Sequence, residues 1–355
     1  MKKPALIDWH LIIPSLFILA FGLTSLLSIN SATALTQLFF LAIGTFFFIF
    51  FSNFNYQDHQ SLIKIYALGC LFLLILPFIF STATRGSVRW IQIGSFTLQP
   101  SEIIKPFIIL IFANFLSNQK TPNMLQYFLL LLLPVFLIFK QPDLGSTLVI
   151  GAIWLGILIA SKIPLLKLLS LAALTILVSP LVFKLLKPYQ QQRISTFLNP
   201  YQDPKGSGYQ VIQSTIAVGS GRFLGKGLGQ GTQSQLQFLP ERETDFIFAS
   251  ISEELGFLGA AALIITYFFL LKRILKISQS TPDKFSYLTA IGIFSMIFFQ
   301  AFINIAMNLG LMPVTGITLP LVSAGGSSLI ATLISLGIVH NIYQHSSERK
   351  SLVIK

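Results

Sequence analysis

The segment LPERETDF at residues 239–246 runs directly into the apolar stretch IFASISEELG at residues 247–256. The chain has only 12 acidic residues, and five of them lie between Glu241 and Glu254. A carboxylate in hydrocarbon is costly and is rarely kept without a partner or a function. The apolar run continues to Leu271, which makes it long enough to span a bilayer. The segment therefore indicates a membrane protein that presents carboxylates at one membrane surface.

The composition supports a polytopic membrane protein. Of the 355 residues, 54% are hydrophobic and 10% are charged, whereas a soluble domain has about 25% charged residues. The single cysteine, Cys70, allows no internal disulfide, and the four scattered histidines offer no metal-ligand spacing. The net charge of +12 favours contact with anionic membrane lipids or an anionic substrate. Binding to nucleic acid is excluded, because no soluble basic domain is available to hold it.

About ten apolar windows are long enough to cross a bilayer. They lie near residues 8–28, 35–51, 62–81, 101–117, 124–139, 144–161, 168–186, 246–271, 285–307 and 320–343. The first window is longer than the apolar region of a signal peptide, so we expect an uncleaved span. Inward loops hold Lys120, Lys162 and Lys272, which obeys the positive-inside rule if both termini are cytoplasmic. The prediction is a single all-α polytopic domain over residues 1–355, with about ten transmembrane helices.

One long extracytoplasmic loop is predicted over residues 187–245, between the seventh and eighth spans. It is rich in glycine, and its weakly amphipathic stretch Tyr209–Val218 predicts a re-entrant or interfacial helix, with a flexible surface loop as the alternative. The sequence GRFLGKG at residues 221–227 lacks both the spacing and the Ser/Thr of a phosphate loop, which excludes a nucleotide site. Its basic residues still suit a pyrophosphate bound through charge-assisted hydrogen bonds.

Two motifs precede the fourth and sixth spans. Pro100 suits a first helical position, and Glu102 lies in that first turn. Lys105 follows on the same face, so the two charges form either a local ion pair or part of a polar functional cavity. Arg89-Trp90 is typical of an interfacial anchor, with sugar stacking and anion binding as the alternative. Asp143 is predicted to cap the helix that follows it.

Helical geometry separates the tasks of the central carboxylates. If a helix begins near Asp245, Glu253 lies roughly 12 Å deeper along its axis, whereas two carboxylates acting on one bond are about 5–9.5 Å apart. We therefore expect Glu253 and Glu254 to pair within the bundle, with Lys105 as one candidate partner. Asp245 either caps the helix, in competition with Thr244, or acts at the interface, or does both.

A second irregular segment supports a groove near Asp245. The sequence PVTGITLPLVSAGGSS at residues 313–328 contains two prolines and three glycines. Non-helical backbone at membrane depth is tolerated only when it is buried in protein or lines a cavity.

These motifs together resemble the SEDS family (shape, elongation, division and sporulation), the polytopic peptidoglycan polymerases, over nearly the whole chain. The resemblance rests on RWI at 89–91, QPSE at 99–102 with Lys105, QPDLG at 141–145, LPE at 239–241, TDFIFA at 244–249, EELG at 253–256 and the segment 308–327. GTQSQL at 231–236 and LMPVTG at 311–316 are similar to the RodA-type elongation members rather than the FtsW-type division members. Glu243 departs from the family pattern, which commonly has His, and it adds negative charge beside Asp245.

The resemblance implies glycosyl transfer on the outer face of the bacterial cytoplasmic (inner) membrane. The 4-hydroxyl of one lipid-linked disaccharide (lipid II) would attack the anomeric carbon of another, and undecaprenyl pyrophosphate would leave with inversion. Asp245 matches the family's catalytic aspartate and would be the general base, with help from a divalent cation (Mg²⁺ or Mn²⁺) at Asp245 left open. A class B penicillin-binding protein is the implied partner.

The same resemblance implies the remaining site residues. The candidates for the departing pyrophosphate are the cations of the long loop, Arg193, Arg222, Lys226 and Arg242. The candidates for lining the substrate groove are Arg89, Trp90, Glu102, Lys105 and Ser327.

Two other kinds of function compete with this interpretation. A lipid II flippase or transporter also needs charged residues inside the bundle, but it needs no carboxylate at the outer interface aligned with a basic loop. A non-catalytic scaffold of the cell-wall elongation complex would tolerate replacement of Asp245.

Overall fold

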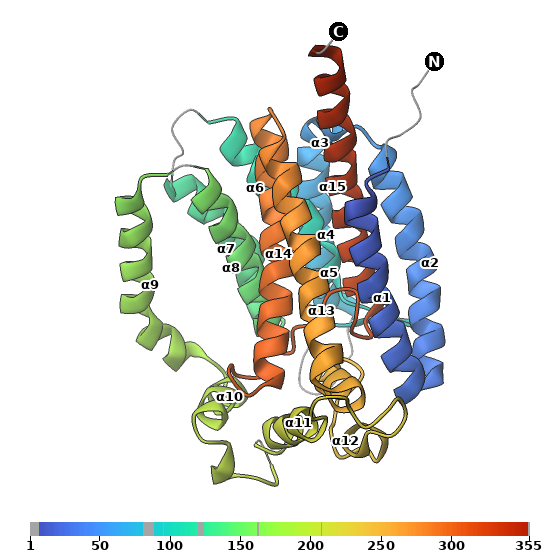
Figure 1. Cartoon of the computed structure of the whole chain (residues 1–355). Helices are drawn as coiled ribbons and strands as arrows, with labels where there is room; N and C mark the ends of the chain where they lie inside the picture. Colours follow the sequence, from blue (N-terminus) through green and yellow to red (C-terminus); the bar gives the residue numbers. More distant parts are fainter. Residues whose placement is uncertain are drawn as a thin grey trace.

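The computed structural model describes residues 7–80, 89–94, 96–119, 124–161, 163–206 and 208–353; Lys120 and Lys162 lie outside these ranges. The described part is a bundle of long helices (Figure 1). Every apolar window overlaps one of them: α1 (Trp9–Ile29), α2 (Ser31–Asn53), α4 (Ile63–Phe80), α6 (Lys105–Ser117), α7 (Met124–Lys140), α8 (Leu144–Ala160), α9 (Leu165–Leu185), α13 (Ile247–Gln279), α14 (Lys284–Asn308) and α15 (Gly326–Val353). Helix α1 begins and α15 ends at the same end of the bundle, as an even number of crossings requires (Figure 1).

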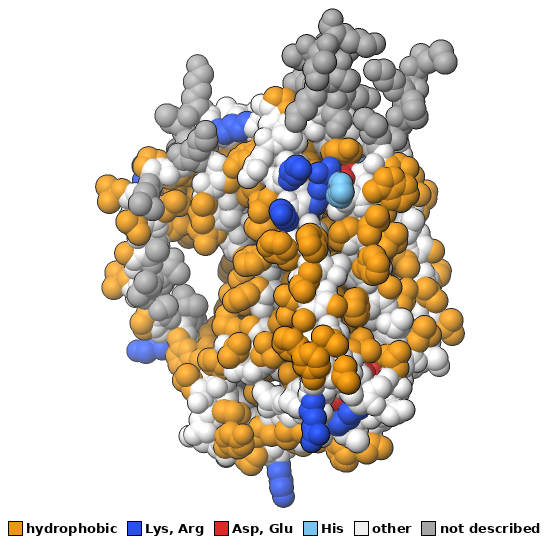
Figure 2. Space-filling model, viewed as in Figure 1, with side chains coloured by type: hydrophobic (Ala, Val, Ile, Leu, Met, Phe, Trp, Pro, Cys, Tyr) orange, Lys and Arg blue, Asp and Glu red, His pale blue; other side chains and the backbone are white. Residues whose placement is uncertain are grey.

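The outside of the bundle is apolar. Among the described residues, six helices are long and hydrophobic enough to cross a bilayer, namely α1, α2, α4, α13, α14 and the Gly326–Ser346 part of α15. Large apolar side chains of these helices point outward: Phe46, Phe72 and Phe268 are between 59% and 64% exposed. Figure 2 shows hydrophobic side chains over the broad middle of the molecule, with Lys and Arg mostly toward its two ends. This is the surface expected of a protein surrounded by lipid.

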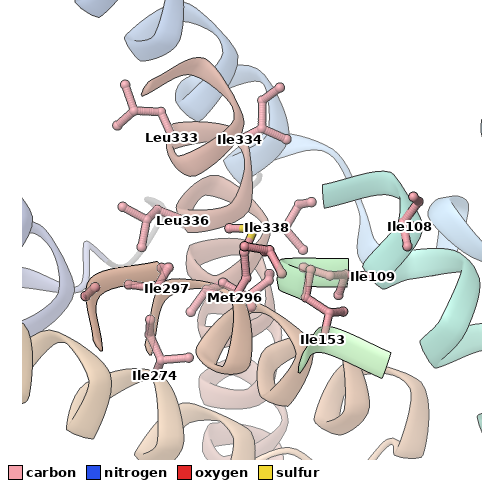
Figure 3. Close-up of a cluster of buried hydrophobic side chains, with 14 of the residues drawn as sticks. Ile108, Ile109, Ile153, Ile274, Met296, Ile297, Leu333, Ile334, Leu336 and Ile338 are labelled. Atoms are coloured by element: carbon pink, nitrogen blue, oxygen red, sulfur yellow. The ribbon is translucent and has the colours of Figure 1, made fainter. Parts of the chain in front are cut away.

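The interior is also apolar and is centred on α14. This helix contacts α6, α8, α13 and α15, while α15 packs along α2 and α1 packs along α13. Ile109 of α6, Ile153 of α8 and Ile297 of α14 have no exposed surface, and they lie together in the cluster of Figure 3. Lipid supplies no hydrophobic driving force between helices, so this close packing of side chains holds the bundle together.

The fourth predicted span is interrupted. It consists of the short helix α5 (Pro100–Ile103) followed by α6, with a turn at Ile104. Pro106 explains the interruption, because proline has no N–H to donate to the carbonyl four residues earlier and its ring clashes there.

A small hairpin is the exception to the predicted all-α fold. Strands β1 (Ile91–Ile93) and β2 (Phe96–Leu98) pair antiparallel, with Gln92 opposite Thr97. Gly94 takes a φ of +62° in the connection, a conformation that glycine adopts at little cost. β-branched and aromatic residues, which favour strands, flank this turn.

The long loop folds over one end of the bundle, which we call the loop end. It forms α10 (Pro188–Leu198), η1 (Pro200–Gln202), α11 (Tyr209–Ser220) and α12 (Thr232–Gln235), beside the start of α13 (Figure 1). Helix α11 includes the amphipathic stretch and packs on α13 and α14. Its Val211, Ser214 and Ala217 are buried, so the prediction of a short helix is confirmed and the flexible-loop alternative is wrong. Helix α3 (Tyr56–Ser61) lies at the other end, between α2 and α4.

Candidate active site

The segment that carries Asp245 is fixed through its backbone carbonyls. Nδ2 of Asn304 and Nδ2 of Asn308 donate to the Asp245 carbonyl at 3.0 and 2.9 Å. Both amides are fully buried and lie four residues apart, on one face of α14. The Ser323 hydroxyl donates to the Thr244 carbonyl at 2.7 Å. Asn304 and Asn308 were not predicted to support the site, although two amides at this spacing in an apolar span are a recognisable signal.

Asp245 is not the cap of α13. The helix begins at Ile247, and its N-cap position is Phe246, which makes no side-chain cap bond. The Thr244 hydroxyl turns instead to Oε2 of Glu241 at 3.1 Å. The prediction that Asp245 or Thr244 occupies the N-cap position of this helix is therefore wrong.

Asp245 and Arg193 converge on the irregular segment before α15. A Cβ atom placed on Gly316 would lie 3.6 Å from Oδ2 of Asp245 and 3.9 Å from Nη1 of Arg193. Gly316 has a φ of +74°, which favours glycine. Nη1 of Arg193 also donates to the Val314 carbonyl at 3.2 Å. A carboxylate and a guanidinium from distant parts of the sequence thus face the same glycine, as the predicted groove near Asp245 requires.

A pocket of about 290 Å³ opens beside Arg193, between α10 and α11. Most of the residues that line it are polar, although slightly more of the lining surface is apolar, and Arg193 is the one ionic side chain among the described residues that line it. The residues that line it are Tyr189, Gln192, Arg193, Thr196, Gly206, Gln210, Val211 and Val314. The site therefore combines a carboxylate with an adjoining polar pocket at the loop end.

Glu253 is enclosed by donors from the long loop. It is fully buried, and its Oε1 accepts from Nζ of Lys226 at 2.7 Å and from the backbone N–H of Gln233 at 3.0 Å. Its Oε2 accepts from the backbone N–H of Ser234 at 3.1 Å. A buried carboxylate with this many donors is compensated for the loss of water. Lys226, a candidate for the pyrophosphate, is therefore engaged in holding α13.

The glycine-rich loop fills a break in α13. Gly256 has φ +65° and ψ −163°, which interrupts the helical hydrogen bonds. The loop replaces them: Lys226 N donates to the Glu253 carbonyl at 3.0 Å, and the Arg222 carbonyl accepts from Phe257 N at 2.9 Å. Backbone groups in a membrane-spanning helix must find partners within the protein. The Arg222 backbone thus belongs to this junction, while its side chain is exposed at the loop end.

Glu102 and Lys105 form a local ion pair. Nζ of Lys105 lies 2.5 Å from Oε1 of Glu102, and the Lys105 side chain is 1% exposed. Of the two alternatives left open by the sequence, the structure shows local pairing. The expected pairing of Lys105 with Glu253 or Glu254 is wrong, because each carboxylate has other partners.

Arg89 faces Asp143 rather than open solvent. Nη1 of Arg89 lies 3.7 Å from Oδ1 of Asp143, and its guanidinium lies 5.9 Å from the centre of the Trp90 ring. Oδ2 of Asp143 accepts from Nε2 of Gln99 and from the Ser101 hydroxyl, each at 2.8 Å. Asp143 thus joins the β1–β2 region, α5 and the start of α8.

Asp143 also caps α8, as predicted. Its Oδ1 accepts from the backbone N–H of Ser146 at 3.1 Å. Burial acts to raise the pKa of this carboxyl, but the Arg89 charge and the hydrogen bonds from Ser146 and Ser101 outweigh it, so the pKa lies below its ordinary value. Ser327, a predicted groove residue, contacts the same region, because its hydroxyl accepts from the Gln99 N–H at 2.9 Å.

The side chains of Arg242 and Glu243 differ in their hydrogen bonding. Nε of Arg242 is buried and has no hydrogen-bond partner among the described residues. Glu243 accepts from Nδ2 of Asn30 at 3.1 Å and from the Thr33 hydroxyl at 2.6 Å. The departure from the family pattern therefore directs the extra carboxylate to the α1–α2 turn, although it lies two residues from Asp245.

A family model and several known proteins match the sequence of this chain. A family model described as cell cycle protein, covering FtsW, RodA and SpoVE, matches residues 5–348. Stage V sporulation protein E of Bacillus subtilis is 38% identical over 96% of this chain and 97% of its own. Peptidoglycan glycosyltransferase MrdB of Escherichia coli is 40% identical over 78% of this chain and 76% of its own.

Solved structures resemble the fold over almost its full length. One is a structure described as structural coordination of polymerization and crosslinking by a peptidoglycan synthase complex. Its TM-score is 0.82 at 32% identity, and the match covers 96% of this chain and 98% of that one. The rod shape determining protein RodA of Thermus thermophilus has a TM-score of 0.70 at 27% identity, covering 95% of this chain and 96% of its own.

Proposed function

Because the chain belongs to the FtsW/RodA/SpoVE family of cell cycle proteins, we propose that Asp245 is the general base of a peptidoglycan polymerase. The chain is a multi-pass membrane protein and a peptidoglycan glycosyltransferase of the SEDS type, with a role in cell elongation and shape. One observation carries the assignment: Oδ2 of Asp245 and Nη1 of Arg193 meet at Gly316 beside a polar pocket.

The proposed reaction joins two lipid-linked disaccharides. Asp245 takes the proton of the acceptor's 4-hydroxyl, and the acceptor oxygen forms a bond to the anomeric carbon of the donor. The bond from that carbon to the phosphate oxygen breaks, and its electron pair leaves with undecaprenyl pyrophosphate. Attack from the face opposite the leaving group inverts the anomeric carbon. The rigid support of the Asp245 backbone by Asn304 and Asn308 holds the base in place for this step.

Arginine side chains are the proposed partners of the leaving pyrophosphate. Arg193 lies across Gly316 from Asp245, and Arg242 has a buried Nε without a partner in the described part of the chain. The exposed Arg222 is the third candidate. Guanidinium groups suit phosphate oxygens because they donate two parallel hydrogen bonds.

A divalent cation at Asp245, Mg²⁺ or Mn²⁺, is also part of the proposal. Among the described residues, no three His, Cys, Asp or Glu side chains gather in a metal-binding group. Mg²⁺ is nevertheless commonly held by one or two carboxylates together with substrate phosphates, so Asp245 fits it only when the pyrophosphate is present. There it would offset the charge of the leaving group.

Two features of the setting are also proposed. The loop end faces the outside of the cytoplasmic membrane, where the lipid-linked precursor is polymerised. A class B penicillin-binding protein assembles with the chain, in keeping with a structural relative that belongs to a complex coordinating polymerization and crosslinking.

Polymerisation of labelled lipid II by the purified full-length chain tests the proposal, with and without a class B penicillin-binding protein. We expect polymer from the wild type and at least 100-fold less from Asp245→Asn, because loss of a general base costs about 10²–10⁴-fold. Asp58→Asn is the control, since it neutralises an exposed carboxylate of α3, at the other end of the bundle. Polymerisation by Asp245→Asn at the wild-type rate would refute the assignment. Absence of polymer from wild type with every partner would favour transport or scaffolding.

A further inference from the structure

The pocket between α10 and α11 has a lining that differs from that of an anion site. Two amide residues, Gln192 and Gln210, line it together with the buried Thr196, and Val211 and Val314 supply an apolar wall. Each amide can both donate and accept hydrogen bonds, and this is what a polyhydroxylated ligand requires. A pyrophosphate would instead need several cations, and the lining supplies only the Arg193 guanidinium.

The aromatic ring in the pocket is held in place. The Tyr189 hydroxyl donates to the Pro142 carbonyl at 3.1 Å, and the residue is 38% exposed. The hydroxyl is thus already engaged while part of the residue stays accessible. An oriented aromatic ring beside amides offers an apolar surface to the C–H groups of a sugar ring.

The position of the pocket selects between the two substrates. Arg193 lines the pocket and also reaches Gly316, where it meets the Asp245 carboxylate. A general base must come within hydrogen-bond reach of the hydroxyl that it deprotonates. In the proposed reaction that hydroxyl belongs to the acceptor. A sugar held in this pocket is therefore placed as the acceptor, next to the base.

We propose that the α10–α11 pocket is a carbohydrate subsite that binds the amino-sugar disaccharide of the acceptor, through Gln192 and Gln210. The assignment of the sugar as acceptor depends on the function proposed above. The volume of about 290 Å³ lies at the lower end of ligand pockets, which are about 300–1,000 Å³. It thus suits sugar rings and leaves the lipid outside.

The test uses two soluble probes with the full-length protein in detergent. One is the lipid-free disaccharide-pentapeptide, which has the acceptor hydroxyl but no pyrophosphate, and the other is inorganic pyrophosphate. Binding is read from the shift in unfolding temperature, and competition is read from inhibition of lipid II polymerisation. The variants are Gln192→Ala and Gln210→Ala. The control is Ser195→Ala, an exposed residue of α10 outside the pocket lining.

We expect each glutamine variant to weaken binding of the disaccharide-peptide up to about tenfold, seen as a higher probe concentration needed in both readouts, since tenfold corresponds to about 1.4 kcal/mol and one hydrogen bond contributes about 0.5–1.5 kcal/mol. Pyrophosphate inhibition should not change, and Ser195→Ala should match the wild type. If the glutamine variants weaken the binding of pyrophosphate and leave that of the disaccharide-peptide unchanged, the pocket is an anion site and the proposal is overturned. Equal behaviour of all variants would overturn it as well.

The binding readout also separates this proposal from the catalytic one. Pocket-dependent binding of the disaccharide-peptide without any polymer would support the carbohydrate subsite and refute the polymerase assignment of Asp245. Polymer formation without pocket-dependent binding would refute the carbohydrate subsite and support the polymerase assignment.

Discussion

The Nζ atom of Lys226 lies 2.7 Å from Oε1 of the fully buried Glu253. This contact connects the glycine-rich loop to α13 and explains why an acidic residue is stable eight residues beyond Asp245. A carboxylate removed from water retains its charge at acceptable cost when several donors surround it. The same contact decides what Lys226 does, because its charge is already paired.

Lys226→Gln should therefore reduce stability rather than only substrate affinity. We expect a loss of about 1–3 kcal/mol, below the usual cost of breaking a fully buried pair because the Lys226 side chain is 28% exposed. Unfolding temperatures of Lys226→Gln, Glu253→Gln and the double variant should show strong non-additivity. Lys205→Gln, an exposed lysine of the same loop, is the control. If Lys226→Gln leaves the unfolding temperature unchanged but lowers the affinity for lipid II, Lys226 would instead be assigned to the pyrophosphate site.

Gly256→Ala should disrupt the junction between α13 and the glycine-rich loop. A Cβ there would lie 2.2 Å from the backbone N of Gly225, and the φ of +65° is unfavourable for alanine. Strain and overpacking together suggest a loss of about 2–5 kcal/mol. Gly151→Ala is the control, because its Cβ would meet nothing within 4 Å. Equal unfolding temperatures for the two variants would show that the break is not needed.

Lys105→Met should leave Glu102 as a buried, unpaired charge. Removing one partner of a buried pair costs about 3–5 kcal/mol, and Lys105 is 1% exposed. The double variant Glu102→Gln/Lys105→Met should recover at least half of the lost unfolding temperature. Lys64→Met, at an exposed position of α4, controls for the change of side chain. A fully stable Lys105→Met protein that makes no polymer would instead place the pair in a functional cavity.

Glu243→Ala should loosen the segment that carries Asp245 from the α1–α2 turn. The carboxylate accepts hydrogen bonds from Asn30 and Thr33, and bonds to a charged group contribute about 1.5–3 kcal/mol each when buried, less at this partly buried position. We expect a several-fold lower rate of polymerisation. Thr33→Val alone should lower the rate by a smaller factor, and the double variant should be no slower than Glu243→Ala. Additive effects of the two variants would contradict this connection.

Asp143 should make the protein sensitive to acid. Its pKa in the folded protein is below the ordinary value of 3.8, so its contribution to stability is complete above that value and is lost as the pH falls through the lower folded pKa. Asp143→Asn should lower the unfolding temperature at neutral pH and flatten its decline toward about pH 3. Asp203→Asn, in the exposed part of the long loop, should keep the wild-type profile. Parallel acid profiles for wild type and Asp143→Asn would refute the prediction.

Local sequence patterns were sufficient for the helices of the bundle. Each apolar window became a helix because hydrocarbon requires every backbone group to be paired within its own segment. The amphipathic stretch Tyr209–Val218 likewise became α11. Patterns failed where a partner from another segment decides the geometry: the window with Pro106 is split, and the start of α13 is set by the turn before it rather than by a side-chain cap.

By itself the sequence determined the membrane fold and the family, and it predicted a role for Asp245, because these depend on composition, spacing and motif. Only the tertiary structure decided which charges meet. It paired Lys226 with Glu253 and Lys105 with Glu102, and it brought Arg193 and Asp245 together at Gly316. The physical reason is that the energy of a buried charge depends on donors within a few ångströms in space, and packing of distant segments, not their order along the chain, sets those distances.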